Sequence, residues 1–154
     1  MITLRPYQET DNVDLNYLLN DEQSTFTALP KDWFENTRQT AYKIVICDNH
    51  QPIGFFVLDD GDDKFDYTND KSALLLRSMS INPNFQGKGY GELALLNLNE
   101  FIDTQQISSN KIVLGVHHKN IAAQKLYEKV GFIKSERTYM GIKGLQYVYE
   151  LNLY

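Results

Sequence analysis

The sequence has 154 residues, of which 42% are hydrophobic, and a formal net charge of −5. This length and composition suit one globular domain with a real core, so we expect a single domain over residues 1–154. The acidic balance argues against a general nucleic-acid-binding protein, which needs clustered Lys and Arg. Cys47 is the only cysteine, which excludes an intrachain disulfide and disfavours a cysteine-based metal site.

The apolar residues are spread in short runs along the chain. No run approaches the length of a membrane span, and the start at Met1–Arg5 lacks the charged and apolar blocks of a signal peptide. We therefore expect a cytoplasmic protein that does not enter a membrane. Cys47 lies within the apolar run Ile44–Cys47, where a buried small residue is a better interpretation than a nucleophile.

Periodicity predicts the elements in chain order. The first half predicts a strand over Ile2–Tyr7, a helix capped by Asp11 and carrying Val13, Leu15, Leu18 and Leu19, a short helix over Lys31–Gln39, and strands over Ala41–Cys47, Ile53–Leu58 and Leu74–Ile81. The second half predicts a helix with Leu95, Leu98, Phe101 and Ile102 turned inward, a strand over Lys111–His117, a helix from Asn120, and strands over Ser135–Ile142 and Gln146–Leu151. Turn residues at 48–52 and at Lys143–Gly144 predict two hairpins.

Strands and helices in this order predict an α/β fold. Its core is a mixed, largely antiparallel central sheet of about seven strands, flanked by about four helices. The chain shows neither internal repeats nor linkers.

An aspartate-rich segment follows the third predicted strand. Six of the thirteen residues from Asp59 to Lys71 are aspartates. A solvated loop is the simpler interpretation, and a negative surface that concentrates an amine substrate is the functional one. The aspartates lack the spacing and final glutamate of an EF-hand, so calcium is not indicated and we expect no metal.

The most informative short segment is Gln86–Gly91, which alternates glycine with other residues between a strand and a helix. Glycines allow turn conformations in which successive N–H groups converge on one anion, and the first turn of the following helix adds positive potential. The spacing fits neither the P-loop of NTPases nor the Rossmann fingerprint. It does match [RQ]-x-x-G-x-[GA], with Gln86, Gly89 and Gly91 at the defining positions.

A second motif covers Asn120–Phe132 and reads N-x-x-A-x-x-L-Y-x-x-x-G-F. Ala123, Leu126, Tyr127 and Val130 share one helical face, and Asn120 and Gly131 suit the two caps of the helix. Together the two motifs and the order of elements resemble the GNAT N-acetyltransferases, and this resemblance extends over nearly the whole chain.

The resemblance implies that acetyl-CoA, and no metal, is the cosubstrate. It would lie between the strands that end at Ile81 and at His117. Pantetheine would pair with backbone groups around Met79, Ser80 and Ile81, where one N–H would also stabilise the oxyanion formed on the thioester. The pyrophosphate and neighbouring groups would contact Gln86, Gly87, Lys88, Gly89, Tyr90, Gly91, Glu92 and Asn120.

The implied reaction is direct attack of an amine on the thioester. Tyr127 occupies the general-acid position of the family, and a phenol that titrates near ~10 is protonated at neutral pH, so it can donate to the departing thiolate. The alternative is that the Tyr127 ring only packs the helix face. A non-catalytic acyl-CoA sensor is the competing class of function.

The base that deprotonates the amine is left open by the sequence. The strand Leu74–Ile81 carries no carboxylate, so Asp59 or Asp60 acting through water, Ser78, Ser80 and a backbone carbonyl are all candidates. His117 and His118 follow a strand and titrate in a useful range, but a loop role suits them better.

The acceptor is also open. Aromatic surface from Trp33, Phe34, Tyr139 and Tyr147 would suit a polyamine or another small cationic amine, if some of these rings line the cleft beside aspartates. A protein N-terminus or lysine is the alternative acceptor. Dimers are common among the relatives, so a homodimer is a further expectation.

Overall fold

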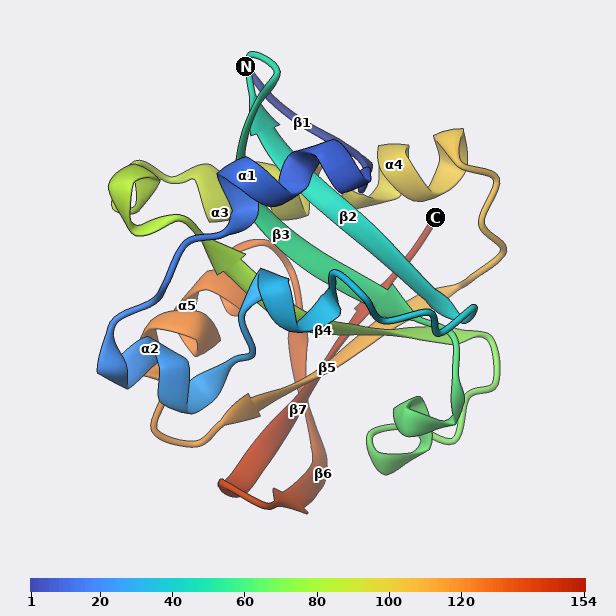
Figure 1. The fold of residues 1–154 in the computed structure, drawn as a ribbon. Coiled ribbons are helices and arrows are strands. Elements are labelled where there is room, and N and C mark those ends of the chain that lie inside the picture. The colour runs from blue at the N-terminus through green and yellow to red at the C-terminus, as the bar shows by residue number, and fades with distance from the viewer.

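The computed structural model describes residues 1–154, and its centre is one seven-stranded sheet (Figure 1). The order across the sheet is β1-β2-β3-β4-β5-β7-β6. The strands are β1 (Ile2–Pro6), β2 (Ala41–Asp48), β3 (Gln51–Asp59), β4 (Ala73–Ile81), β5 (Lys111–His117), β6 (Ile133–Gly141) and β7 (Gly144–Asn152). Every neighbouring pair is antiparallel except β4 and β5, which are parallel.

The helices are short and cover both faces of the sheet. They are α1 (Asn12–Leu15), α2 (Asp21–Phe26), α3 (Tyr90–Leu96), α4 (Leu98–Thr104) and α5 (Ile121–Lys129), with 3-10 turns η1 (Glu9–Asp11), η2 (Pro30–Trp33), η3 (Asp62–Asp66) and η4 (Pro83–Phe85). In Figure 1, α1 and α2 lie in front of the sheet, and α3, α4 and α5 lie behind it. No helix combines the length and apolar character needed to cross a membrane.

Side chains of the central strands point alternately to the two faces of the sheet and fill a core on each face. On β2, Ile44 and Ile46 face a cluster of 19 buried residues that includes the inner residues of α3 and α4. Val45 and Cys47 face the other side and pack with Leu15, Tyr17 and Trp33. Side chains that alternate between two covered faces explain why β2 and β3 are apolar at nearly every position. The buried Cys47 confirms the structural interpretation of this residue.

The sheet agrees with the sequence prediction, and so do both hairpins. The first helices do not. Asp11 does stand at the N-cap position of α1, but its buried carboxylate makes no capping hydrogen bond to that helix, because it binds Arg5 at 2.6 and 2.8 Å and the N–H of Gln8 at 2.8 Å; the helix itself ends at Leu15. The helix predicted over Lys31–Gln39 is a single 3-10 turn, and α2 was not predicted at all.

The helix after the glycine-rich segment is also divided. Asn97 separates α3 from α4, and its side-chain amide donates to the carbonyl of Ile2 at 3.1 Å. The apolar periodicity continues across this break, since Leu95, Leu98, Phe101 and Ile102 are all buried as predicted. Asn97 therefore anchors α3 and α4 to β1, and the two helices still bury the same face.

Candidate active site

A cleft of about 920 Å³ opens where β4 and β5 separate. The two strands pair only from Ala73 to Leu75 on β4 and from Lys111 to Val113 on β5. Beyond these residues the facing edges diverge, and both walls become part of the cleft. Its lining comes from α2, β4, the segment 85–92, β5, α5 and the turn between β6 and β7. Unpaired edges of two parallel strands are the place where an extended ligand can add main-chain hydrogen bonds.

The glycine-rich segment forms one end of this cleft. Gly87 and Gly89 have φ values of +77° and +79°, which only glycine adopts readily, and Gly89 begins α3. No atom lies within 4 Å of where a Cβ would stand at either residue. These glycines are therefore required by backbone conformation, and the space beside them is open to a ligand.

Two lysines on α5 bring positive charge to the same end. Lys125 and Lys129 line the cleft, and Lys129 pairs with Glu92 of α3 at 3.1 Å. Neither lysine was predicted as a site residue from the sequence, although their spacing of four residues on the Asn120 helix places them on one face. Lys88, which was expected to contact the cofactor, is not part of the lining, and its ammonium lies 5.8 Å from the centre of the Phe85 ring.

Gln86 lies at the junction of the loop and β4. Its side-chain amide donates to the carbonyl of Ile81 at 2.9 Å and exchanges hydrogen bonds with the amide of Gln23 on α2, at 3.1 and 3.2 Å. Gln86 thus fastens the loop to β4 and to α2. Gly87, Gly89, Tyr90, Gly91 and Glu92 complete the part of the predicted loop that lines the cleft.

Tyr127 of α5 faces the cleft from the opposite wall. The residue is 9% exposed, and its ring packs edge-on against Phe132 at 5.4 Å. Its hydroxyl has no hydrogen-bond partner in the protein, yet no fully buried polar side-chain atom lacks one. The hydroxyl must therefore reach open space, and Tyr127 is part of the cleft lining. Burial raises the pKa of this phenol to about 12, so it stays protonated at neutral pH.

Asn120 holds the start of α5. Its side chain accepts a hydrogen bond from the backbone N–H of Ala123 at 3.3 Å, and Gly131 ends the helix with a φ of +107°. Both caps that the sequence predicted are confirmed. Asn120 also lines the cleft, so capping leaves it beside the space that a ligand would occupy.

The cleft edge of β4 is braced by two aromatic residues. Ser78 has a φ of +58° and lies in a register shift between β3 and β4. The indole N–H of Trp33 donates to the Ser78 hydroxyl at 3.0 Å, and the Tyr17 hydroxyl lies 2.7 Å from the Ser80 hydroxyl and 3.2 Å from its carbonyl oxygen. Residues 78–81, including Met79, Ser80 and Ile81, all line the cleft. Tyr17 could not be predicted from the sequence, because the predicted helix continued through Leu18 and Leu19, whereas α1 ends at Leu15.

The aspartates considered as bases lie elsewhere. Asp59 is fully buried and accepts hydrogen bonds from the Gly61 N–H, Arg38 and Thr40. Burial alone would raise the pKa of Asp59, but these hydrogen bonds outweigh it and hold the pKa below its usual value. Asp60 pairs with the buried Lys64 at 2.8 Å. Neither carboxylate lines the cleft, so the hypothesis that one of them acts as a base through water loses its geometric basis.

The four aromatic residues expected near the acceptor are dispersed. Trp33 is buried, Phe34 stacks on Tyr7 at 5.9 Å, and Tyr147 is covered by Lys134, whose ammonium lies 3.6 Å from the ring centre. Only Tyr139 lines the cleft. Phe26 of α2, which the sequence analysis missed, also lines it.

His117 joins three parts of the cleft. Its ring lies 5.1 Å from the Phe26 ring, its Nδ1 accepts from the Lys119 N–H at 3.1 Å, and its Nε2 donates to the Lys143 carbonyl at 2.9 Å. These two bonds require the neutral tautomer that carries its proton on Nε2. His117 therefore acts as a structural link between β5, α2 and the β6–β7 turn, which agrees with the loop role expected from the sequence.

Comparison with known proteins assigns the family. The profile described as "Acetyltransferase (GNAT) family" matches residues 7–132. The chain belongs to the GNAT acetyltransferase family. A curated relative, the uncharacterized N-acetyltransferase YbbJ of Bacillus subtilis, is 35% identical over 136 residues, which cover 86% of this chain and 85% of the relative.

Solved structures of this family share the fold. The aminoglycoside acetyltransferase AAC(6')-Ib with coenzyme A matches with a TM-score of 0.76 and 20% identity, over 99% of this chain and 95% of that one. Spermidine N-acetyltransferase from Vibrio cholerae, with CoA and spermine, matches with a TM-score of 0.64 and 20% identity, over 98% of this chain and 95% of that one. The seven-stranded GNAT fold, and with it the resemblance seen in the sequence, is confirmed.

Proposed function

We propose that this GNAT protein is an enzyme that transfers the acetyl group of acetyl-CoA directly to the primary amine of a small molecule. The observation that carries the proposal is the divergence of β4 and β5 next to a loop of left-handed glycines. An extended arm that ends in a diphosphate fits this combination, since the strand edges offer main-chain hydrogen bonds and the loop offers converging N–H groups.

The residues for this cosubstrate form two groups. Met79, Ser80 and Ile81 would bind the arm through their backbone, while Gln86, Gly87, Gly89, Tyr90, Gly91 and Glu92 would surround the diphosphate. Asn120 lies beside this path at the start of α5. Lys125 and Lys129 of α5 are cationic residues of the cleft lining, and Lys129 lies beside Glu92; they would offset the negative charge of the phosphates.

The chemical step uses few protein groups. A backbone N–H on the β4 edge would donate to the developing oxyanion. Tyr127, with a pKa of about 12, would donate its proton to the thiolate as the carbon–sulfur bond breaks. A thiol titrates near ~8.5, so the tyrosine is never the stronger acid at equilibrium. Its contribution is to stabilise the leaving sulfur through a charge-assisted hydrogen bond, and any proton that it transfers to the sulfur would be replaced from water, which receives the proton of the amine.

Deprotonation of the amine needs no protein carboxylate in this scheme. Glu22 and Glu92 are the only acidic residues in the cleft lining, and Glu92 is paired with Lys129 on the phosphate side. The small fraction of the acceptor that is free amine at neutral pH would attack directly, and the proton that its nitrogen loses after attack would pass to water in the open cleft.

The relatives leave the acceptor undecided, because aminoglycoside and spermidine enzymes share the fold at about equal identity. Thiol release from acetyl-CoA tests the proposal when purified protein is mixed with polyamines, aminoglycosides, amino acids and short peptides. We expect release with only some of these acceptors. Tight binding of CoA with no release from any acceptor would instead favour a non-catalytic acyl-CoA sensor, and release with peptides alone would favour a protein N-terminus or lysine.

A further inference from the structure

The charge of the cleft is opposite to what an aspartate-lined site for polyamines would need. None of the six aspartates between Asp59 and Lys71 lines the cleft. Asp59 and Asp63 are both bound by Arg38 and Arg77, at 2.7–3.3 Å, which makes this group of four neutral. The aspartate-rich segment therefore stabilises its own loop and provides no free negative charge to an acceptor.

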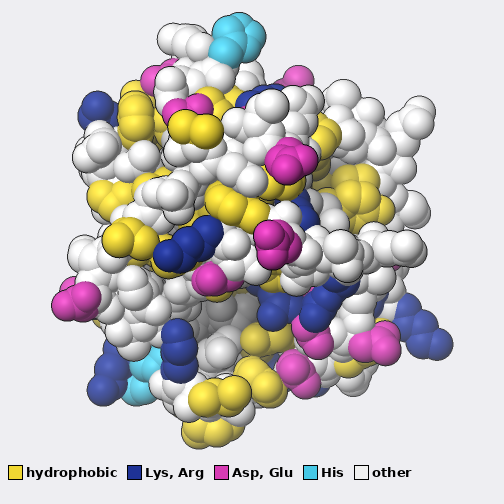
Figure 2. Space-filling model, in the orientation of Figure 1, with side chains coloured by type: hydrophobic (Ala, Val, Ile, Leu, Met, Phe, Trp, Pro, Cys, Tyr) yellow, Lys and Arg dark blue, Asp and Glu magenta, His cyan; other side chains and the backbone are white.

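The end of the cleft away from the phosphate loop is rich in hydrogen-bond donors. Its charged lining residues are Arg77, Lys143 and Glu22, and both ring nitrogens of His117 are occupied by hydrogen bonds within the protein. In Figure 2, Lys and Arg side chains lie on the rim of the hollow that opens below the centre of the molecule. Arg77 is balanced by Asp59 and Asp63, and Lys143 and Glu22 balance each other, so this end of the cleft offers a polycation no net negative charge.

Arg77 is oriented to bind an anion. Its guanidinium lies 5.5 Å from the centre of the Trp33 ring, and its side chain is one third exposed. Only its Nη1 donates to Asp59 and Asp63, so Nη2 and Nε have no partner. An arginine held by stacking and by ion pairs, with donors free, is suited to bind a carboxylate through two parallel hydrogen bonds.

Arg77 is also next to the reacting part of the cleft. It directly precedes Ser78, where β4 departs from regular geometry, and Met79 and Ser80 follow on the edge proposed to hold the thioester. Lys143 approaches from the β6–β7 turn, and its ammonium lies 3.4 Å from the Ser24 carbonyl of α2. The two cations thus line the same cleft from different elements.

We propose that the acceptor is a small amine that itself carries a carboxylate, such as an amino acid, and that Arg77 and Lys143 bind this carboxylate. The inference rests on the proposed acetyl transfer and specifies its substrate class. Binding one end of the acceptor to two cations would leave its amine free to point at the β4 edge. An ammonium bound by carboxylates would instead be held in its protonated, unreactive form.

The experiment compares matched acceptors: L-aspartate, L-glutamate and β-alanine, each against its carboxamide, with spermidine as the polycation. Rates of thiol release give kcat/KM for each. We expect each carboxylate to exceed its carboxamide by at least about tenfold, roughly the effect of one charge-assisted pair. Because a carboxamide lowers the pKa of the neighbouring amine and leaves more free base, nucleophile availability alone would give the opposite order.

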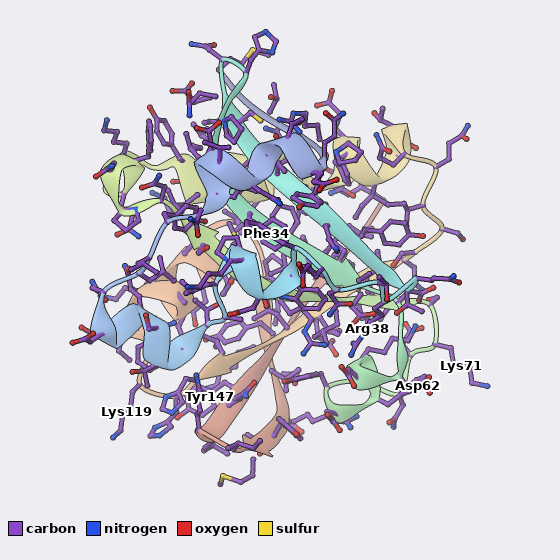
Figure 3. All side chains as sticks on the ribbon, viewed as in Figure 1. Phe34, Arg38, Asp62, Lys71, Lys119 and Tyr147 are labelled. Carbon is purple, nitrogen blue, oxygen red and sulfur yellow. The ribbon has the colours of Figure 1, made fainter.

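Lys143→Gln is the decisive variant, since Lys143 is exposed and outside both cores. It should lower kcat/KM about threefold to tenfold for carboxylates and leave the carboxamides unchanged. Lys71→Gln is the matched control: Lys71 lies on the far side of the molecule from Lys119 and Tyr147 (Figure 3) and does not line the cleft. Arg77→Lys tests the forked geometry while keeping the charge near Asp59.

The outcomes separate the two proposals. Faster turnover of spermidine or of the carboxamides would overturn the carboxylate inference and leave the acetyltransferase proposal intact. An equal loss in Lys71→Gln and Lys143→Gln would also overturn the inference. If no acceptor releases thiol, the acetyltransferase proposal fails. Calorimetry of L-aspartate against the CoA-saturated protein then tests recognition alone, and no preference over the carboxamide would overturn the inference too.

Discussion

The two sides of the cleft are made from different kinds of structure. The side proposed for the cofactor consists mainly of backbone: the unpaired edges of β4 and β5 and two glycines with positive φ. The opposite side consists of side chains from α2, β4, β6 and the β6–β7 turn, with Phe26, Arg77, Tyr139 and Lys143 among them. The first arrangement depends on glycine positions and strand ends, and the second depends on which long side chain occupies each position.

This difference teaches how one family can keep a cosubstrate and vary its acceptor. Backbone groups make the same hydrogen bonds whatever the neighbouring side chains are, so substitutions elsewhere leave such a site intact. Side chains such as Arg77 and Lys143 are changed by single substitutions, which change charge and specificity without altering the sheet. A substitution on one side should therefore leave the other side intact unless its side chain braces both.

The largest effect is expected from Tyr127→Phe, which removes one hydroxyl from the cofactor side. General acids contribute on the order of 10²-fold or more to rate, so kcat should fall by about that factor while the affinity for acetyl-CoA changes little. Steady-state kinetics and calorimetry measure the two quantities separately. An unchanged kcat would return Tyr127 to a packing role against Phe132.

The pH profile provides an independent check on Tyr127. Since burial raises its pKa to about 12, the protonated phenol persists throughout the range in which the amine loses its proton. Activity should therefore rise with pH up to about 10 and show no alkaline decline caused by the tyrosine. A decline centred below pH 9 that is absent from Tyr127→Phe would contradict the raised pKa.

A second large effect is expected from Gly89→Glu in the phosphate loop. A side chain at φ +79° is strained by about 1–2 kcal/mol, and the added carboxylate would stand in the space proposed for a diphosphate. The dissociation constant of acetyl-CoA should rise more than about tenfold. Gly89→Ala supplies the strain without the charge and should have a smaller effect. Unchanged affinity of both variants by calorimetry would refute the loop assignment.

The same contrast explains how much the sequence revealed. The local structure on the side proposed for the cofactor could be predicted because its signals are local: Gly89 and Gly91 follow a strand, and Asn120 and Gly131 cap a helix with a clear apolar face. Each feature is fixed by residues within a few positions of it, and local rules apply. Lys88 differs from the other predicted loop residues, because it does not line the cleft and its ammonium lies over the Phe85 ring instead.

The acceptor side could not be predicted, because its geometry depends on contacts between distant residues. The periodicity around Leu15 and Leu18 suggested one helix, yet the chain leaves helical geometry after Leu15 and Tyr17 turns toward Ser80, 63 residues away. Likewise, nothing local shows that the aspartates after β3 are neutralised by Arg38 and Arg77. Tertiary ion pairs override the charge pattern that suggested a cationic acceptor.

Arg38→Gln tests this neutralisation outside the cleft, in the lower right part of Figure 3 where Arg38 and Asp62 are labelled. The buried carboxylate of Asp59 would lose a charged donor at 2.7 Å, which we expect to cost about 2 kcal/mol of unfolding free energy at neutral pH. The pKa of Asp59 is lowered by folding, so this stabilisation is present above its unfolded pKa near ~3.9 and is lost as pH falls through the folded value.

Urea unfolding at pH 7 and near pH 3 measures this difference. The gap between Arg38→Gln and the parent protein should shrink at the lower pH, and acetyl-CoA affinity should not change, because Arg38 does not line the cleft. A gap of equal size at both pH values would show that Arg38 stabilises the fold by packing alone.

The smallest effect is expected from Trp33→Phe. Trp33 links the two sides of the cleft. The indole N–H braces Ser78 at 3.0 Å, directly before the β4 edge. Losing this bond should cost about 1 kcal/mol of stability and lower kcat by a few-fold, because a slightly displaced strand edge misaligns the oxyanion donor. Phe34→Leu is the matched control, since Phe34 stacks on Tyr7 away from the cleft. It should lose similar stability with unchanged kcat. Equal losses of activity in the two variants would mean that Trp33 supports only the core, and that the side chains of the acceptor side do not position the backbone of the cofactor side.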